Sequence, residues 1–247
     1  MTDNSMTKGT KAVLLVVMIL VADQILKIWV KTTMVLGDEI PIFGNWAILH
    51  FLENNGMAFG LELGGETGKV ILTLFRMVAA VAIGWYLMQL VKRDAPVGFV
   101  LAVGAIMAGA IGNIIDSAFY GMIFSESYYQ AATMFPEGGG YSSFLHGRVV
   151  DMFYMPVIDT HWPDWSPIKP GQSLIFFRPV FNLADSAITT GVITIIIFQK
   201  RFFEHEDILI DRKGSEKDAG RSGNNDSGRD SDSTSLTATA DTGDNIL

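Results

Sequence analysis

Four long apolar runs alternate with polar segments along the chain, and each can cross a bilayer, for which about 20 apolar residues suffice. The runs predict membrane-spanning helices over residues 12–30, 70–91, 96–115 and 179–198. The first run begins like a signal peptide, but apolar residues resume at Ile25 and no clear small-x-small cleavage site follows. We therefore expect an uncleaved first helix and an all-α membrane protein with four transmembrane helices.

Basic residues mark one side of the predicted membrane. Lys8 and Lys11 precede the first run, the pair 92–93 (Lys-Arg) fills the short link between the second and third, and 200–201 (Lys-Arg) follows the fourth. By the positive-inside rule, both termini and this link lie in the cytoplasm. The segments of about residues 31–69 and 117–178 then lie on the extracytoplasmic side.

The two outer segments differ in character. Residues 46–53 form a strand-like run and are followed by Asn54, Asn55 and Gly56, a strong turn signal, so we expect a small extracytoplasmic β platform that can pair with an extended peptide. The second segment is long, aromatic and interrupted by prolines and by the glycines at 138–140. Connections of this length are usually functional or disordered, and we expect a lid with a hinge at these glycines.

Composition separates the end of the chain from this membrane domain, which we place at residues 1–203. Residues 204–247 contain 11 acidic and 5 basic residues and so supply −6 of the formal net charge of −8. They are rich in Gly, Ser, Asp and Thr, which cannot bury enough apolar surface to offset the entropy lost on ordering. We predict a disordered, acidic cytoplasmic tail.

Polar side chains within the runs indicate where the chemistry lies, because ionised groups in hydrocarbon are costly and usually functional. From the helix rise of about 1.5 Å per residue, Asp23 lies about 18 Å from the cytoplasmic end, Asp185 about 22 Å, Arg76 about 24 Å and Asn113 about 30 Å. These groups thus converge on the outer half of the membrane. Asp185 is the leading candidate, and Asp151 is the natural second carboxylate of an aspartyl dyad.

Three further pairs share a helix face, namely Asp23 with Lys27, Asn113 with Asp116, and Asn182 with Asp185. They are candidates for groups that contact or orient the dyad. Simpler interpretations remain open. Asp23 and Lys27 form an intrahelical ion pair, and Asn54 stabilises the turn that follows it. Asp185 interacts with the helix dipole, and Asp151 is a loop acid paired with Arg148. Arg148 could also contact lipid headgroups.

Other chemistries have little support. The chain has no cysteine and only four scattered histidines, which disfavours metal sites, cysteine nucleophiles and a serine triad, and we expect no cofactor. The competing class is a proton-linked membrane transporter, because membrane acids often mark ion pathways. Against it, the inner halves of the helices are apolar, so no path continues inward. A catalytically inactive lipid-binding scaffold is disfavoured by the aspartate pair.

Five motifs occur together in one order along residues 10–200. They are Asp23-Gln24-x-x-Lys27, Asn54-Asn55-Gly56-x-Ala58-Phe59, Gly109-Ala110-x-Gly112-Asn113-x-x-Asp116, Val149-Val150-Asp151 and Phe181-Asn182-x-Ala184-Asp185-Ser186-x-Ile188. With four predicted spans, this series resembles lipoprotein signal peptidase, the type II signal peptidase of bacteria.

The resemblance implies a membrane-embedded aspartyl endopeptidase that removes signal peptides from diacylglyceryl-modified prolipoproteins, cutting before the lipid-bearing cysteine. It implies Asp151 and Asp185 as the catalytic aspartates. The supporting residues it implies, with Arg148 added as a candidate from its position, are Asp23, Lys27, Asn54, Gly56, Asn113, Asp116, Asn182 and Ala184. The expected partners are the lipid-modified substrate and membrane lipids, without nucleic acid, for a monomer in the bacterial inner membrane with its active site near the outer face.

The chain departs from the family pattern in two places. Ser117 stands where the family typically has arginine after the aspartate of the Gly-Asn-x-x-Asp motif, so a positive charge is missing there, which Arg148 or Arg76 could replace. The segment 121–147 is longer than usual, and the tail after Glu204 lies outside the pattern. Neither departure affects the dyad itself.

Overall fold

The computed structural model describes residues 6–44, 46–55, 65–156, 158–161, 165, 167, 173–176 and 179–202. The helices are α1 (Lys8–Thr33), α2 (Gly65–Lys92), α3 (Val97–Ile115), the π-helical turn η1 (Asp116–Tyr120), the short α4 (Gly121–Ile123) and a last helix, Leu183–Phe202. The strands are β1 (Glu39–Phe43), β2 (Ala47–Asn54), β3 (Val149–Tyr154), β4 (Ile158–His161), β5 (Ser173–Phe176) and β6 (Val180–Phe181). Gly56 and the predicted tail, 204–247, lie outside the described residues.

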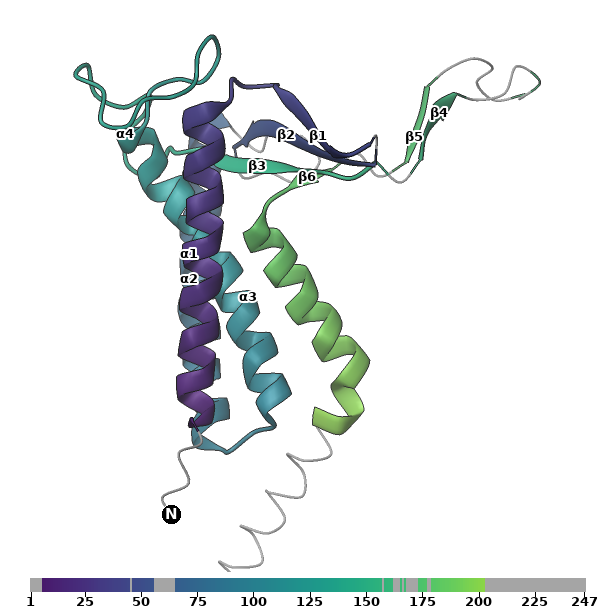
Figure 1. Cartoon of the computed structure of the whole chain (residues 1–247). Helices are drawn as coiled ribbons and strands as arrows, with labels where there is room; N and C mark the ends of the chain where they lie inside the picture. The colour runs from purple at the N-terminus through teal and green to yellow at the C-terminus, as the bar shows by residue number, and fades with distance from the viewer. Residues whose placement is uncertain are drawn as a thin grey trace, which may run out of the picture. The chain divides into compact units, whose positions relative to one another are not determined.

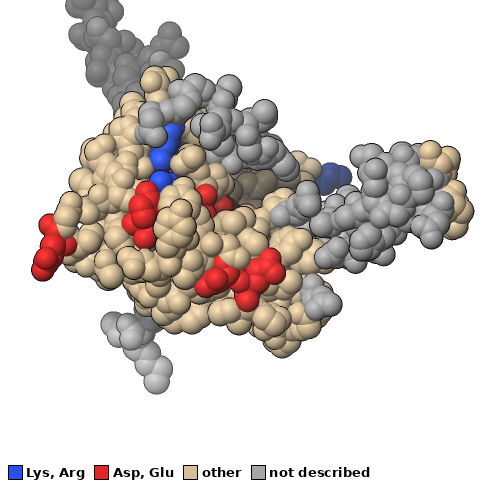
Figure 2. Space-filling model, turned by 90° about the horizontal axis from the view of Figure 1, so that it is seen from above, with Lys and Arg blue, Asp and Glu red and all other residues tan. Residues whose placement is uncertain are grey.

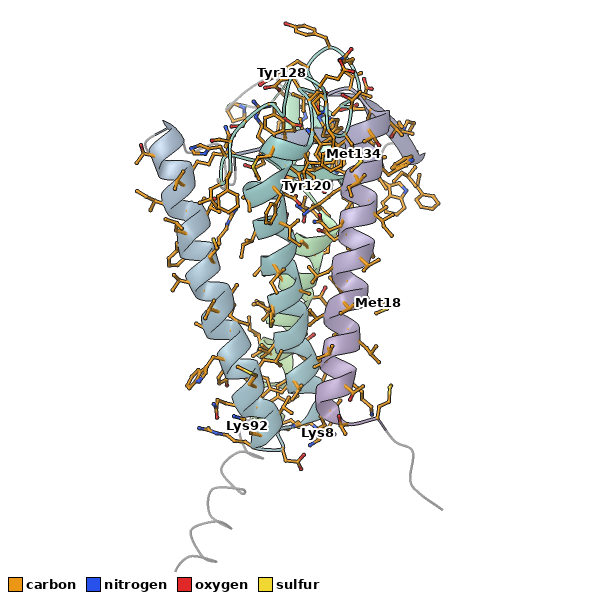
Figure 3. All side chains as sticks on the ribbon, turned by 90° about the vertical axis from the view of Figure 1, so that its left-hand side faces the viewer. Lys8, Met18, Lys92, Tyr120, Tyr128 and Met134 are labelled. Carbon is orange, nitrogen blue, oxygen red and sulfur yellow. The ribbon has the colours of Figure 1, made fainter. Side chains whose placement is uncertain are left out.

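Four helices in the described part of the chain are long and apolar enough to cross a membrane, which confirms the predicted spans. Their ends are joined by two apolar clusters. One cluster joins the starts of α1 and α3 to the ends of α2 and the last helix, through Ala12, Val100, Leu90 and Phe202. The other joins the end of α1 and η1 to the sheet, through Val30, Tyr120, Phe51 and Met152. The helices therefore alternate in direction, with the sheet at the end away from Lys8 and Lys92 (Figures 1 and 3).

Helix α3 is the centre of this helical arrangement. It packs against α1 and α2, and its surface is the most buried of the four spans. The last helix approaches α3 through glycines: a Cβ added at Gly109 would lie 2.2 Å from the carbonyl oxygen of Ala184, and one at Gly191 would lie 2.6 Å from that of Ala102. Small residues permit such close backbone contact between membrane helices. This close contact between α3 and the last helix explains why the Gly109-Ala110-x-Gly112-Asn113 motif begins with glycine.

The sheet is antiparallel, with strand order β1-β2-β3-β6, and β4 pairs with β5 in a separate hairpin. The prediction of a small β platform is confirmed in part, since β1 and β2 lie in the first outer segment. Strands β3 and β6 instead come from the second outer segment and from the predicted fourth span. Asp151 therefore lies in a central strand, opposite Leu52 of β2, and not in a loop. Such pairing between distant segments is not visible in local sequence patterns.

The predicted start of the fourth span, at residue 179, was wrong. Val180 and Phe181 form β6, with Phe181 paired to Phe153 of β3, and the helix begins only at Leu183. The apolar run is continuous across this change from strand to helix, so hydropathy alone does not locate it. Asp185 consequently lies in the first turn of the helix and not several residues inside it.

Candidate active site

Asn182 and Asp185 cap the last helix reciprocally. Oδ1 of Asn182 accepts a hydrogen bond from the backbone N–H of Asp185 at 2.9 Å, and Oδ2 of Asp185 lies 3.4 Å from the backbone nitrogen of Asn182. This is the arrangement of a capping box, in which two unpaired N–H groups at a helix start are satisfied. The interpretation of Asp185 as a helix-start acid therefore holds, and the same contacts fix its carboxylate in place.

The Asp151 carboxylate is held by two amide side chains. Nδ2 of Asn182 donates to Oδ1 at 2.8 Å, and Nδ2 of Asn54 donates to Oδ2 at 3.3 Å. Asn54 reaches it because the β2–β3 register pairs Asn54 with Val149, two residues before Asp151. With 4% of its surface exposed, Asp151 is almost enclosed.

Asn113 connects Asp185 to the same network. Its Nδ2 donates to Oδ1 of Asp185 at 2.8 Å, and its Oδ1 accepts from Nδ2 of Asn182 at 3.1 Å. Burial, and then the negative charge of Asp185, raise the pKa of Asp151 to about 7, although the amides of Asn54 and Asn182 act in the opposite direction. Arg76 of α2 lies within electrostatic range of both aspartates. The two carboxyls thus share one electrostatic environment.

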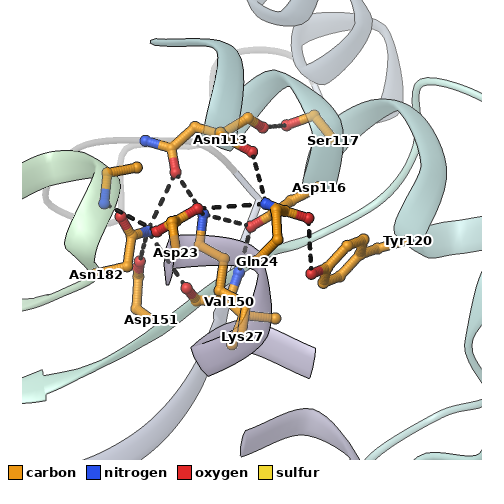
Figure 4. Close-up of polar contacts among 12 residues, drawn as sticks. Asp23, Gln24, Lys27, Asn113, Asp116, Ser117, Tyr120, Val150, Asp151 and Asn182 are labelled. Atoms are coloured by element: carbon orange, nitrogen blue, oxygen red, sulfur yellow. Dashed lines mark hydrogen bonds and ion pairs between the residues drawn. The ribbon is translucent and has the colours of Figure 1, made fainter. Parts of the chain in front are cut away.

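In the interior, Lys27 binds two further carboxylates, those of Asp23 and Asp116 (Figure 4). Its Nζ lies 2.9 Å from Asp23 and 2.9 Å from Asp116, and all three side chains are fully buried. Oδ1 of Asp23 accepts from the backbone N–H of Ala184 at 2.9 Å, and Oδ2 of Asp116 accepts from that of Val150 at 3.2 Å. Each buried carboxylate therefore holds the amide that immediately precedes a candidate aspartate.

Comparison with known proteins identifies the family. The family model described as signal peptidase (SPase) II matches residues 15–201. This chain belongs to the signal peptidase II family. A lipoprotein signal peptidase of Porphyromonas gingivalis is 49% identical over 207 residues, covering 83% of this chain and 88% of the relative. That of Amoebophilus asiaticus is 39% identical, covering 73% of each chain.

A solved structure agrees at the level of the fold. A bacterial membrane enzyme superposes with a TM-score of 0.51 at 24% identity, covering 78% of this chain and 88% of that chain. The protein is accordingly a membrane protease of the signal peptidase II family. The comparisons give no support to the transporter alternative.

Ser117 and Arg148 both concern the positive charge that the family pattern places after Asp116. Ser117 is buried in η1 and donates to the backbone oxygen of Asn113, in the last turn of α3, at 3.0 Å, so it supplies no charge to the site, as expected. The sequence left three interpretations of Arg148 open: a pair with Asp151, a contact with lipid headgroups, or a replacement for the charge missing at Ser117. Within the described chain, its ion pairs are with Glu53 and Glu126, both at 2.8 Å, so the proposed pairing of Arg148 with Asp151 was wrong.

The interior of the signal peptidase also contains groups that the sequence analysis did not select. Nε2 of Gln24 donates to Oδ1 of Asp116 at 3.0 Å, and the Tyr120 hydroxyl donates to Oε1 of Gln24 at 3.2 Å. The sequence signal for Gln24 was its position beside Asp23 in the first motif. The position of Tyr120 is set by the π-helical turn η1, and π-turns often occur at functional sites. No local sequence pattern predicts that turn.

Proposed function

We propose that this signal peptidase cleaves its substrate by an aspartyl mechanism in which Asp151 and Asp185 act as a catalytic pair. The protein removes signal peptides from prolipoproteins. The substrate carries a diacylglyceryl-modified cysteine, and the cut falls immediately before that cysteine. The observation that carries the mechanism is the joint hydrogen bonding of the two aspartates through Asn182 and Asn113.

The chemistry follows from one proton shared between two carboxyls. The raised pKa of Asp151 keeps it protonated up to about pH 7, so Asp151 serves as the acid of the pair and Asp185 as its base. Asp185 takes a proton from a water molecule, whose oxygen attacks the scissile carbonyl carbon, and Asp151 donates its proton to the carbonyl oxygen. When the resulting diol collapses, Asp185 donates its proton to the cysteine nitrogen as the C–N bond breaks, and Asp151 takes a proton back from a diol hydroxyl, which restores the pair. The products are a carboxylate on the signal peptide and a free amine on the lipoprotein.

The remaining polar groups orient this pair. Lys27, Asp23 and Asp116 hold the backbone before each aspartate, and Asn54, Asn113 and Asn182 direct their carboxylates. Hydrogen bonds of this kind preorganise an active site before the substrate binds. Ala184 contributes its backbone N–H, and Gly56 is proposed from the family resemblance.

The position of the site suits a substrate anchored by lipid. Lys8, Lys11, Lys92, Arg93, Lys200 and Arg201 all belong to the helix ends remote from the aspartates. By the positive-inside rule, those ends and both termini face the cytoplasm, and the aspartates lie near the outer surface of the inner membrane. There, water can reach the dyad while the acyl chains stay in the bilayer. The enzyme acts as a monomer with membrane lipids around its helices.

The test uses a diacylglyceryl-modified prolipoprotein and a gel-shift assay with purified enzyme in detergent. Asp151→Asn and Asp185→Asn should each abolish cleavage while the variants still accumulate in the membrane. Near-normal cleavage by either variant would refute the catalytic pair. An unlipidated precursor serves as the substrate control and should remain uncut.

A further inference from the structure

A second group of charged residues lies at the sheet end of α1, outside the site described above. We call Lys31, Glu53, Glu126 and Arg148 the charge cluster. Oε1 of Glu53 pairs with the Lys31 ammonium, and Oε2 lies 2.8 Å from Nη1 of Arg148. Arg148 also binds Glu126 through both terminal nitrogens, at 2.8 and 3.0 Å. The cluster contains two cations and two anions and is therefore neutral.

The inner members of the cluster are enclosed by protein. The side chains of Lys31 and Glu53 are 1% and 2% exposed, whereas those of Arg148 and Glu126 are 20% and 44% exposed. Burial alone would raise the pKa of Glu53, but the charges of Lys31 and Arg148 lower it overall, so Glu53 is ionised. In the view from above, basic and acidic side chains adjoin on part of the surface (Figure 2).

Aromatic rings complete the surroundings of both cations. The Lys31 ammonium lies 4.9 Å from the ring centre of Tyr141 and 5.5 Å from that of Phe124. The Arg148 guanidinium lies 4.6 Å from the same Tyr141 ring and 5.5 Å from that of Tyr128. Cations over aromatic faces are stabilised by the ring quadrupole. Tyr141 also accepts the backbone N–H of Arg148 at 2.7 Å, which fixes this residue at two points.

The cluster anchors the long segment 124–148 to α1 and to the sheet. The backbone N–H of Ala132 donates to the carbonyl of Lys31 at 2.9 Å, and the Ser127 hydroxyl donates to Glu53 at 3.1 Å. Further along, a Cβ at Gly140 would lie only 2.1 Å from the carbonyl oxygen of Gly121. A Cβ at Gly138 or Gly139 would meet no atom within 4 Å, so the hinge at residues 138–140 stays a prediction. The segment is a strap over the end of α1.

The charge cluster adjoins the catalytic pair through two strands. Glu53 directly precedes Asn54, whose Nδ2 contacts Asp151 at 3.3 Å, and Arg148 directly precedes β3. In the β2–β3 register, Glu53 lies opposite Val150 and Asn54 opposite Val149. The ion pair of Glu53 and Arg148 therefore joins the strand ends at the place where Asn54 reaches across to Asp151. Any shift of that end of β2 would move the Asn54 amide away from the carboxylate.

We propose that Glu53 is a positioning residue for peptide hydrolysis: held by Lys31 and Arg148, it fixes the end of β2 so that Asn54 stays hydrogen-bonded to Asp151. The inference rests on the proposed function, since it assumes that Asp151 is catalytic. It assigns the long strap a role in proteolysis, because the strap supplies Glu126, Ser127 and Arg148 to the cluster.

The test is a double-mutant cycle on Glu53 and Asn54, with kcat and KM measured on a diacylglyceryl-modified prolipoprotein. Glu53→Gln should lower kcat by about tenfold or more with little change in KM, because small misplacements of a catalytic group can cost up to about 100-fold. Asn54→Ala should lower kcat at least as much. If Glu53 acts through Asn54, adding Glu53→Gln to Asn54→Ala has no further effect on kcat. Independent, multiplicative losses would overturn the proposal, as would a wild-type kcat for Glu53→Gln.

Two controls separate positioning from folding. Glu39→Gln removes a half-exposed carboxylate of the neighbouring strand β1, which pairs with His50 and does not belong to the charge cluster, and should leave kcat near that of the wild type. Should Glu53→Gln reduce the folded yield, Glu53→Gln with Lys31→Met removes both members of the buried pair, and the cycle is run with this double change in place of the single one. A kcat restored to the wild-type value in that variant would overturn the proposal.

A parallel measurement on Asp151→Asn separates the two possible failures. If Asp151→Asn is inactive and the cycle is multiplicative, only the positioning role of Glu53 fails. If Asp151→Asn cleaves normally, the proposed catalytic pair fails as well.

Discussion

Nδ2 of Asn182 lies 2.8 Å from Oδ1 of Asp151, while Oδ1 of the same side chain accepts the backbone N–H of Asp185 at 2.9 Å. One amide thus contacts the residue at the centre of a strand and the residue at the start of a helix. The separation of the two aspartates depends on how this side chain is oriented.

Replacing Asn182 by alanine should therefore impair catalysis more than folding. We expect Asn182→Ala to lower kcat by about 100-fold through misplacement of the aspartates, and to lower the free energy of unfolding by about 1 kcal/mol through loss of the helix cap. Ser186→Ala is the matched control, because Ser186 lies in the same turn and bonds only the backbone oxygen of Asn182 among its described contacts. Similar losses of kcat in both variants would contradict a specific role for Asn182.

Lys27 should be essential for folding as well as for activity. Lys27→Met leaves Asp23 and Asp116 buried without their shared cation, and breaking a buried pair typically costs about 3–5 kcal/mol. We expect a large fall in the melting temperature in detergent, together with loss of cleavage. Lys11→Met, on the same helix but at its other end, should melt close to the wild type. An unchanged melting temperature for Lys27→Met would show that the buried carboxylates do not depend on it.

The contact of α3 with the last helix predicts a sharp difference between two glycines. A Cβ at Gly109 would lie 2.2 Å from the Ala184 carbonyl oxygen, so Gly109→Ala must separate the helices and shift Asp185. Gly104, also in α3, has its closest neighbour at 3.7 Å, and Gly104→Ala should be tolerated or stabilising by about 0.5–1 kcal/mol. Melting temperature and cleavage rate measured on both variants check this, and equal tolerance would contradict the close packing.

The raised pKa of Asp151 predicts the pH dependence of activity. Because Asp151 must be protonated to donate its proton, kcat/KM should fall as pH rises through about 7, approaching about tenfold per pH unit.

The pKa of Asp151 also makes the stability of the protein depend on pH. Because folding raises this pKa, the ionised carboxyl destabilises the folded state above about pH 7, and this penalty is relieved as the pH falls towards the pKa of the carboxyl in the unfolded chain. Asp151→Asn should accordingly gain stability relative to the wild type at pH 8 and not at pH 4. A gain of equal size at both pH values would contradict the shift.

The sequence predicted the parts of the fold that depend on local pattern. Apolar runs located all four spans, and spacing of three or four residues placed Lys27 next to Asp23 and Asn182 next to Asp185. The same spacing from Lys27 to Lys31 places Lys31 on the buried face of α1 as well.

What could not be predicted depends on pairing between distant segments. The apolar run that contains Phe181 is compatible with either a strand or a helix. Only the pairing of Phe181 with Phe153 shows that this residue lies in a strand. The sequence offered Asp151, the nearest acid along the chain, as one possible partner of Arg148, whereas the sheet brings Glu53 to it. Spacing in the sequence therefore predicts partners that lie on the same helix. It does not predict partners that are brought together by the register of two strands.

The most direct test asks whether Asp151 and Asp185 act as one unit. The cleavage rate of a diacylglyceryl-modified prolipoprotein is measured for Asp151→Asn, Asp185→Asn and the double variant, since groups that share one catalytic task show strongly non-additive losses. If the two aspartates share one catalytic task, each single variant falls to the same residual rate and the double variant is no slower. A single variant that retains substantial cleavage, or a double variant whose loss is the product of two partial losses, would contradict it.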